Sequence, residues 1–459
     1  MAPANHYDLL IIGGGQAGIP LAHALARAGK RVALAEREHL GGSCVNFGCT
    51  PTKAAIASAR LAHMTRRGAE FGLKIPSVDV NFCAVIERAR QISAASRQRL
   101  EAGFAGSKNP KLLRGHARLD GCQGSAFRVR LENGAVTTDQ VVLNTGTRSA
   151  IPPIDGLKEV KVIDAENWLE LTELPAHLAM IGGGAIGLEM AQFYRRMGSR
   201  VTVIEHSGQV AGHEDKEVAD AMQTFLQAEG IEFRLNTPVT RIEPGRDGIT
   251  VRLGEDGSSS LAASHLFIAV GRQPNTDALG LDTIGVAVSP RGIVEANKRL
   301  QTNVRGVWVA GDIRGGPQFT HTSWDDHRVL LSQMAGDGTR TTRRVVPYAI
   351  FTDPELGRVG MSESEARRAG HEVKIGRFDM ARNGKAAEIG ETQGFIKLVV
   401  DARSRLILGA AVLASDGAEL VHSYIDVMNA RAPYTVIGDA IHIHPTLAEA
   451  IQSAALAID

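Results

Sequence analysis

The chain has 459 residues, of which 44% are hydrophobic and 22% are charged, and its formal net charge is +1. This length accommodates several domains, and this charge balance gives no signature of a nucleic-acid or membrane partner. No apolar run approaches the roughly 18–20 residues of a membrane helix, and residues 1–15 lack the features of a signal peptide. We therefore expect a cytoplasmic protein that binds neither nucleic acid nor membranes.

The first predicted unit combines a strand at residues 9–12, a glycine-rich turn, a helix that ends at Gly29 and a strand at residues 31–35 that runs into Glu36. The turn has the pattern G-x-G-x-x-G, with its glycines at Gly13, Gly15 and Gly18. In this context the glycines permit a tight turn, close approach of a pyrophosphate and close helix–strand packing, and the acid accepts hydrogen bonds from ribose hydroxyls. The unit therefore predicts a bound dinucleotide.

Two cysteines follow in the segment GGSCVNFGCTPTK, at Cys44 and Cys49, in a chain with only four cysteines. On an ideal helix, residues five apart are separated by roughly 7.5 Å along the axis and about 140° around it. A disulfide needs Cα atoms within about 4.4–6.8 Å, so a bridge requires a distorted helix, for which Gly48 and Pro51 are suited. A zinc site would need a second pair of ligands, which the other two, isolated cysteines do not offer. We expect no metal.

A second unit of the same design occupies residues 178–205, with a helix that ends at Gly198 and a strand at residues 201–204 before Glu205. Its glycines are Gly182, Gly184 and Gly187. A carboxylate at Glu205 bonds the 2′-hydroxyl of NAD and repels the 2′-phosphate of NADP, and no lysine or arginine lies between residues 206 and 215. We therefore predict two dinucleotides, the second being NADH in preference to NADPH.

The last third of the chain has a different pattern. Residues 395–401 and 406–414 alternate or run apolar in short stretches, which predicts antiparallel strands. Ser362 and Glu365 have the spacing of a capping box at a helix start. The chain ends with HIHPTLAE and a segment without cysteine.

The segment GGSCVNFGCTPTK closely resembles the redox-active segment of the class I pyridine nucleotide–disulfide oxidoreductases, which include dihydrolipoamide dehydrogenase, glutathione reductase and mercuric reductase, and the resemblance covers the whole chain. It implies an α/β fold with two Rossmann-like domains, for FAD and NAD, and a C-terminal α+β dimerisation domain with an antiparallel sheet. The implied divisions are residues 1–150 and 272–345 for FAD, 151–271 for NAD(P)H and 346–459 for dimerisation.

The resemblance also implies roles for the redox residues. Cys44 is the thiol that attacks the substrate, and Cys49 is the thiol that faces the flavin. Lys53 lies beside the flavin and pairs with Glu189 from the second unit. The other implied cofactor contacts are Gly42, Ser43, Thr145, Gly146, Asp312 and His321 for FAD, and Gly271 for NAD.

His444 and Glu449 match the family's His–Glu pair within an H-P-T…E motif. An imidazole is a suitable base for a dithiol mechanism, and a carboxylate fixes its tautomer. In the family this pair reaches into the active site of the other subunit, which implies a homodimer with composite active sites. Ala185 stands where glutathione-reductase-like members have a tyrosine lid, which favours open access for NADH.

The substrate implied is a small-molecule disulfide or dithiol, or a lipoyl-bearing protein, reduced or oxidised through NAD(H), FAD and the Cys44–Cys49 disulfide. The chain is similar to a branch of FAD-containing, mercuric-reductase-like oxidoreductases, but it lacks the C-terminal cysteine pair that carries mercury. A metal-ion (mercury or copper) or quinone reductase is the alternative activity. A non-catalytic flavoprotein or redox-sensing module is the alternative of another class, and the His–Glu pair argues against it.

Overall fold

The first sheet is built around the N-terminal glycine turn, in a computed structural model that describes residues 5–458. Its strand order is β3-β2-β1-β6-β5-β4, and β17 pairs with β6. The central strand β1 pairs in parallel with β2 and β6, and β17 also runs parallel to β6, so the chain returns to this sheet after the second unit. The strands are β1 (His6–Ile12), β2 (Val32–Glu36), β3 (Lys111–Arg114), β4 (Arg118–Gln123), β5 (Ala126–Leu131), β6 (Gly134–Leu143) and β17 (Val307–Val309).

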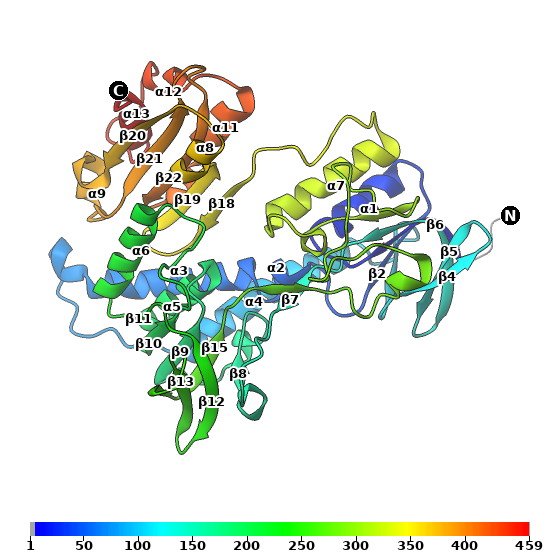
Figure 1. The fold of residues 1–459 in the computed structure, drawn as a ribbon, viewed down its shortest axis with the longest axis horizontal. Coiled ribbons are helices and arrows are strands. Elements are labelled where there is room, and N and C mark those ends of the chain that lie inside the picture. Colours follow the sequence, from blue (N-terminus) through cyan, green and yellow to red (C-terminus); the bar gives the residue numbers. More distant parts are fainter. Residues whose placement is uncertain (1–4, 459) are drawn as a thin grey trace.

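Helices flank this sheet, as Figure 1 shows. Helix α1 (Gly18–Arg27) packs beside α7 (Thr320–Ala335), and the long helices α3 (Cys49–Arg66) and α4 (Phe82–Ala102) pack against each other. α1 buries one apolar stripe that includes Leu21 and Leu25, as the spacing of an amphipathic helix predicts. α3 also packs against α5 of the second unit, so it joins the two dinucleotide-type units.

The second unit is a parallel sheet of order β11-β10-β9-β15-β8, flanked by a three-stranded antiparallel sheet β12-β13-β14. The chain enters the second unit after β7 and leaves it at β16, and these two strands form a short antiparallel pair. The elements are β7 (Thr147–Ser149), β8 (Val162–Ile163), β9 (His177–Ile181), α5 (Ala185–Met197), β10 (Arg200–Ile204), α6 (Lys216–Ala228), β11 (Glu232–Arg234), β12 (Val239–Gly245), β13 (Gly248–Leu253), β14 (Ser259–Ala263), β15 (His265–Ile268) and β16 (Arg272–Pro274).

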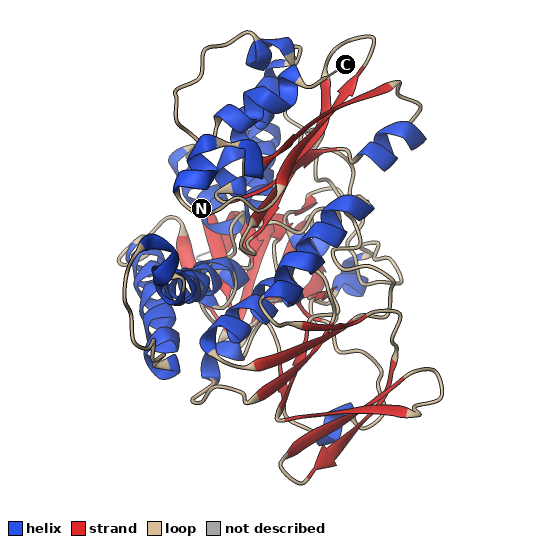
Figure 2. Ribbon diagram, turned by 90° about the vertical axis from the view of Figure 1, so that its left-hand side faces the viewer, coloured by secondary structure: helices blue, strands red, loops and turns tan. Residues whose placement is uncertain are grey.

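The C-terminal part forms a five-stranded antiparallel sheet of order β18-β19-β22-β21-β20, and Figure 2 shows this sheet with helices beside it near the C-terminus. Ser362 caps α8, and Ser362 and Glu365 form the predicted capping box. The elements are β18 (Pro347–Ile350), β19 (Glu355–Gly360), α8 (Glu363–Arg368), β20 (Val373–Asp379), α9 (Gly384–Glu388), β21 (Phe395–Asp401), β22 (Ile407–Ala414), α10 (Gly417–Leu420), α11 (His422–Ala430), α12 (Thr435–Gly438) and α13 (Glu449–Leu456).

The two sheets that are built on a glycine turn, together with the C-terminal antiparallel sheet, confirm the predicted α/β fold class with a C-terminal α+β part. Over residues 5–458, none of the helices combines the length and the apolar character needed to cross a membrane.

Candidate active site

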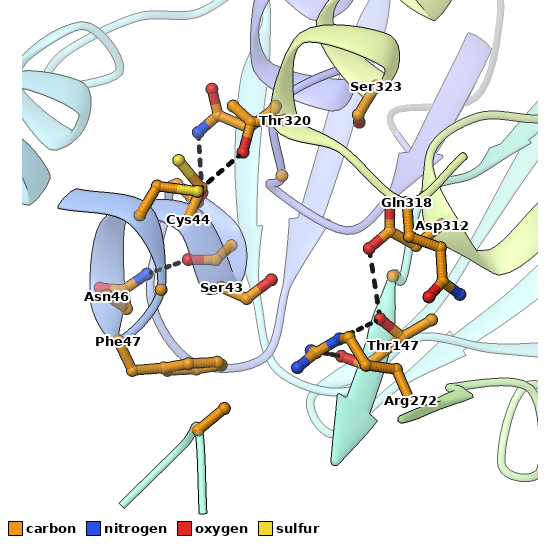
Figure 3. A pocket seen from close by; sticks show the side chains of 18 of the residues that line it. Ser43, Cys44, Asn46, Phe47, Thr147, Arg272, Asp312, Gln318, Thr320 and Ser323 are labelled. Atoms are coloured by element: carbon orange, nitrogen blue, oxygen red, sulfur yellow. Dashed lines mark hydrogen bonds between the residues drawn. The ribbon is translucent and has the colours of Figure 1, made fainter. Parts of the chain in front are cut away.

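A cavity of about 1320 Å³ runs from the first glycine turn to the cysteine pair and the dimerisation part. It exceeds the roughly 300–1,000 Å³ of a typical small-molecule pocket, which suits an extended ligand such as a dinucleotide. Figure 3 shows Cys44, Thr147, Asp312 and Thr320 around part of it. The predicted FAD residues that line it are Gly13, Gly15, Glu36, Gly42, Ser43, Lys53, Thr145, Gly146, Asp312 and His321.

The first glycine turn has the close contacts that a dinucleotide cradle requires. Gly13 has φ +107°, and a Cβ there would lie 2.2 Å from the carbonyl oxygen of Asn144. A Cβ on Gly18 would lie 2.3 Å from the Gly13 carbonyl oxygen, and the Gly18 N–H donates to the Asn144 side chain at 2.9 Å. No side chain caps α1, so its N-terminus can receive a pyrophosphate. Gly18 therefore shapes the turn from behind, and the turn fits FAD.

The second glycine turn repeats this construction. A Cβ on Gly182 would lie 2.4 Å from the Ala269 carbonyl oxygen, and one on Gly187 would lie 2.1 Å from the Gly182 carbonyl oxygen. Gly184 is the N-cap of α5 and has no capping side chain. Gly271 lies with φ +121° just before β16, where the chain leaves this unit. The predicted NAD turn therefore also fits a dinucleotide.

The two acids at the strand ends occupy equivalent positions. The Gly14 N–H donates to Glu36, and the Gly183 N–H donates to Glu205, each at 2.7 Å. Burial opposes the charge of Glu205, but hydrogen bonds from Ser207 and Gly183 hold the pKa of this carboxyl below its ordinary value. Glu205 is therefore a carboxylate, the charge state that the NADH prediction requires.

Two further residues contact Glu205. His206 Nδ1 lies 2.8 Å from a Glu205 oxygen, and its side chain is exposed. Arg234 ends the neighbouring strand β11, and its carbonyl oxygen accepts from the Glu205 N–H at 2.9 Å. Of these two residues, His206 contacts the Glu205 carboxylate, whereas Arg234 contacts its backbone.

The distortion predicted around Gly48 takes the form of a break between two helices. α2 (Gly42–Asn46) ends before Gly48, and α3 begins at Cys49. The Gly48 N–H donates to the Ser43 carbonyl oxygen at 2.6 Å, and a Cβ on Gly48 would lie 2.9 Å from that oxygen. Pro51 lies in the first turn of α3, where a backbone N–H has no acceptor within the helix, so the missing N–H of proline costs no hydrogen bond. The break lets the two cysteines approach each other.

No disulfide links Cys44 and Cys49 in the structure. Their mutual hydrogen bond, together with burial, raises the pKa of Cys44. The hydrogen bond from Cys44, with help from Thr320 and Lys53, outweighs burial and lowers the pKa of Cys49 to about 6. The pair therefore holds its negative charge on Cys49, and Cys44 keeps its proton.

Lys53 lies between the cysteine pair and the second unit. Its Nζ is 2.7 Å from Glu189 Oε2 and 4.5 Å from the centre of the Phe351 ring. Although burial opposes its charge, Glu189 raises the pKa of Lys53, so this side chain is a cation. The Lys53–Glu189 contact implied by the resemblance is present, and the Phe351 ring also contacts the Lys53 ammonium.

One face of α5 fixes the segment that carries Phe351. The Phe351 N–H donates to Glu189 Oε1 at 2.9 Å. The Gln192 amide exchanges two hydrogen bonds with the Asp353 backbone, each 2.8 Å long. Arg196, with a 4% exposed side chain, donates to Asp353 at 2.8 Å and to Glu229 at 2.7 and 2.8 Å. Glu189, Gln192 and Arg196 thus hold the start of the dimerisation part against the cysteine site.

Asp312 is held from the opposite wall of the cavity. Thr147 Oγ1 lies 3.3 Å from Asp312 Oδ2, and Arg272 donates to Thr147 Oγ1 at 2.7 Å (Figure 3). Burial raises the pKa of Asp312. His321 also lines the cavity, and its Nε2 is bonded to the Pro347 carbonyl oxygen at 2.7 Å.

His444 and Glu449 form a pair on the dimerisation part. His444 Nδ1 lies 2.9 Å from Glu449, and the Thr446 N–H donates to the same carboxylate at 2.9 Å. The bond from Thr446, then the one from His444, holds the pKa of Glu449 below its ordinary value. The His444 side chain is 77% exposed, and neither residue is among the described residues that line the cavity. The pair is preformed but faces outward in one chain.

Several residues at the site were not singled out from the sequence. Thr320, Phe351 and Arg272 contact Cys49, Lys53 and Thr147 respectively. Each pair is separated by more than a hundred positions, so no local pattern connects its members.

Two glycine-turn units that share a cavity with a cysteine pair define a dinucleotide-dependent thiol–disulfide oxidoreductase. The chain belongs to the pyridine nucleotide-disulphide oxidoreductase family, whose model matches residues 7–326, and the dimerisation domain of this family matches residues 346–455. Members of this family are FAD- and NAD(P)-dependent flavoproteins, so the predicted class of enzyme and its two cofactors are confirmed. The dimerisation domain supports the predicted homodimer.

Similar proteins occur in several bacteria. The chain is 34% identical to a probable pyridine nucleotide-disulfide oxidoreductase, RclA, of Escherichia coli, over 97% of this chain and 98% of that protein. It is 32% identical to a dihydrolipoyl dehydrogenase of Cupriavidus necator, over 99% and 98%. A solved Cu(II) complex of the HOCl-induced flavoprotein disulfide reductase RclA matches with a TM-score of 0.89 at 34% identity, over 98% and 99% of the two chains.

Proposed function

We propose that the protein is an NADH-dependent disulfide reductase of the cytoplasm, active as a homodimer with composite sites, that acts on a small-molecule disulfide or dithiol. The observation that carries this proposal is the Cys44–Cys49 pair, placed in the wall of the cavity that begins at the first glycine turn. The division of the chain at residues 150, 271 and 345 is part of the proposal. A lipoyl-bearing protein is the alternative partner.

The chemistry that bound FAD supplies is the relay of two electrons from NADH to the Cys44–Cys49 disulfide. The Cys44 thiolate then attacks one sulfur of the substrate disulfide, which forms a mixed disulfide and releases one thiolate. The Cys49 thiolate attacks the Cys44 sulfur, which releases the second product thiolate and restores the Cys44–Cys49 bond. Two electrons and two protons are thus transferred to the substrate.

The attack by Cys44 requires a base, because its hydrogen bond to Cys49 and its burial raise the pKa of this thiol. We assign that role to His444 of the partner subunit, which takes the proton of Cys44 and returns it to the leaving thiolate. Glu449 orients the ring and stabilises the imidazolium. The outward orientation of the pair in one chain supports this assignment.

Lys53 acts electrostatically on the thiol of Cys49. Its positive charge, kept by Glu189, lowers the pKa of Cys49 and favours negative charge on a flavin beside it. The glycines of the two turns, with Glu36, Thr145, Gly146 and Asp312, hold FAD and NADH in this proposal. Glu205 and the open face at Ala185 support NADH in preference to NADPH.

Steady-state assays with NADH and a panel of dihydrolipoamide, glutathione disulfide, Cu(II), Hg(II) and quinones test the proposal. We expect turnover of at least one disulfide, and we expect Cys44→Ser and His444→Ala each to abolish most of it. Undiminished disulfide turnover by His444→Ala would contradict the composite site. The same disulfide turnover by Cys44→Ser would contradict the dithiol mechanism itself.

Reduction of Cu(II) is the second candidate, because a structurally similar protein, RclA, is known as a Cu(II) complex. Over residues 5–458, no group of three or more histidine, cysteine, aspartate or glutamate side chains is arranged to hold a metal ion. In this second candidate a copper substrate would bind the thiols of Cys44 and Cys49. Cu(II) turnover that needs both thiols, without turnover of any disulfide, would favour this candidate.

A further inference from the structure

Residues 44–49 connect the two cysteines, and Figure 3 shows Cys44 and Phe47 of this connection at the wall of the cavity. α2 ends inside the connection and α3 begins at Cys49, so the connection is not part of one continuous helix. In a continuous helix the carbonyl oxygen of Phe47 would accept from the N–H of residue 51. That residue is Pro51, which has no N–H, so the helix supplies no donor for this carbonyl.

Trp168 supplies the donor. Its Nε1 donates to the Phe47 carbonyl oxygen at 2.8 Å, and its side chain is fully buried. The ring packs edge-on against Phe193 of α5, with ring centres 6.0 Å apart. The short 3-10 helix Trp168–Glu170 lies between β8 and β9, which are both strands of the second sheet. The connection between the cysteines is therefore held by the unit that carries the second glycine turn.

The two partners of this bond are both fixed by α4. Arg90 on α4 donates to the Leu169 carbonyl oxygen at 2.9 Å, next to Trp168. Ser93 on the same helix donates to the Val45 carbonyl oxygen at 2.5 Å, within the connection between the cysteines. One helix thus holds the segment that provides the indole donor and the segment that accepts from it, so neither segment is free to move away from the other.

The indole bond keeps the two thiols together when no covalent bond joins them. Cys44 and Cys49 are hydrogen-bonded to each other in this arrangement. An attack between two groups of one chain is faster the more often the groups lie in the reactive geometry. We propose that Trp168 is a positioning residue for the redox pair, whose bond to Phe47 holds residues 44–49 in the conformation from which Cys49 attacks Cys44. This inference rests on the proposed disulfide reductase function.

The step concerned is the second half of the thiol exchange, when Cys44 is joined to one sulfur of the substrate. The Cys49 thiolate attacks the Cys44 sulfur, so the Cys44–Cys49 bond forms, the bond to the substrate sulfur breaks, and the second product leaves as a thiolate. Without the indole donor, the connection samples more conformations, and fewer of them align the two sulfurs. The open pair loses more order than the disulfide does, because the covalent bond by itself restricts the same residues.

The test follows product release from a model disulfide by the full-length flavoenzyme. All proteins carry Cys83→Ser and Cys122→Ser, so the exposed thiols outside the pair do not react. The pair is reduced with dithiothreitol, the reductant is removed, and one equivalent of dithiodipyridine is added in an anaerobic stopped-flow instrument. The attack by Cys44 releases the first thiopyridone, and the attack by Cys49 releases the second, so absorbance separates the two steps.

Two tryptophan variants are compared with this parent. Trp168→Phe removes the Nε1 donor and keeps a buried aromatic ring. Trp308→Phe is the matched control, because Trp308 Nε1 donates to Gln140 at 3.0 Å in the first sheet, and neither of these two is among the described residues that line the cavity.

We expect Trp168→Phe to slow the second release about five- to tenfold and to leave the first within about twofold, since a hydrogen bond of this kind has that strength. The reduction potential of the pair should rise by about 20–30 mV, which is the same factor converted for two electrons. Trp308→Phe should change neither quantity. An unchanged second release in Trp168→Phe, or an equal slowing of both releases, would overturn the proposal. Trp168→Leu provides the same comparison if Trp168→Phe fails to retain FAD.

The experiment separates this inference from the proposed function. If the parent releases both thiopyridones and Trp168→Phe matches it in both steps, the role of Trp168 is wrong and the disulfide mechanism stands. If the parent does not release the second thiopyridone, the disulfide mechanism itself is wrong, and the role of Trp168 with it.

Discussion

Removal of Arg196 should test how the second unit holds the dimerisation part against the cysteine site. Arg196 is almost fully buried and bridges Glu229 and Asp353, whose side chains are 15% and 9% exposed. Arg196→Met keeps much of the volume but leaves two carboxylates without their cation. Loss of one partner of a buried ion pair costs about 3–5 kcal/mol, so we expect the free energy of unfolding to fall by about that amount.

Equilibrium urea unfolding, followed by circular dichroism and flavin fluorescence, measures this change. Arg200→Met is the matched control, because Arg200 pairs with Glu232 at 2.7 Å on the surface, with side chains 59% and 39% exposed. Such an exposed pair contributes at most about 1 kcal/mol. If the two variants lost similar stability, the bridge from α5 to residue 353 would not hold the structure together as we describe.

Three further outcomes follow from the site. Glu205→Ala should raise the preference for NADPH over NADH by about tenfold in kcat/KM, since the repulsion of a 2′-phosphate is removed, and an unchanged ratio would show that Glu205 does not set selectivity. Because the pKa of Cys49 is lowered to about 6, its thiolate band in the reduced enzyme should persist at neutral pH and disappear as the pH falls through about 6, whereas a midpoint at the ordinary thiol pKa would contradict the assignment. Gly48→Ala should lower the free energy of unfolding by about 1–3 kcal/mol, because the added Cβ would lie 2.9 Å from the Ser43 carbonyl oxygen. Gly384→Ala is the control and should leave the free energy of unfolding unchanged, because a Cβ there would have no atom within 4 Å.

The sequence predicted the parts of the fold that local spacing encodes. Each glycine turn and the acid at its strand end lie within one stretch of about 30 residues, and the capping box at Ser362 is shorter still. Each of these features is present in the structure. The same holds for the strands at residues 395–401 and 407–414. In each case the pattern of residue types is itself the cause of the local geometry.

The rest of the site depends on contacts that no local pattern records. Thr320 reaches Cys49 across 271 positions, and Phe351 covers Lys53 because α5 of another unit holds its backbone. The pairing of the Glu205 backbone with Arg234 on the neighbouring strand β11 is likewise absent from any local pattern. Tertiary packing, not residue spacing, decides these neighbours.

The central claim is that two electrons from NADH come to rest on the Cys44–Cys49 pair. Anaerobic titration of the flavoenzyme with NADH tests it most directly. We predict that about one equivalent of NADH per FAD produces the long-wavelength thiolate-to-flavin band, with both cysteines then open to alkylation. Direct bleaching of the flavin by that equivalent, with no band and with the disulfide intact, would contradict the claim.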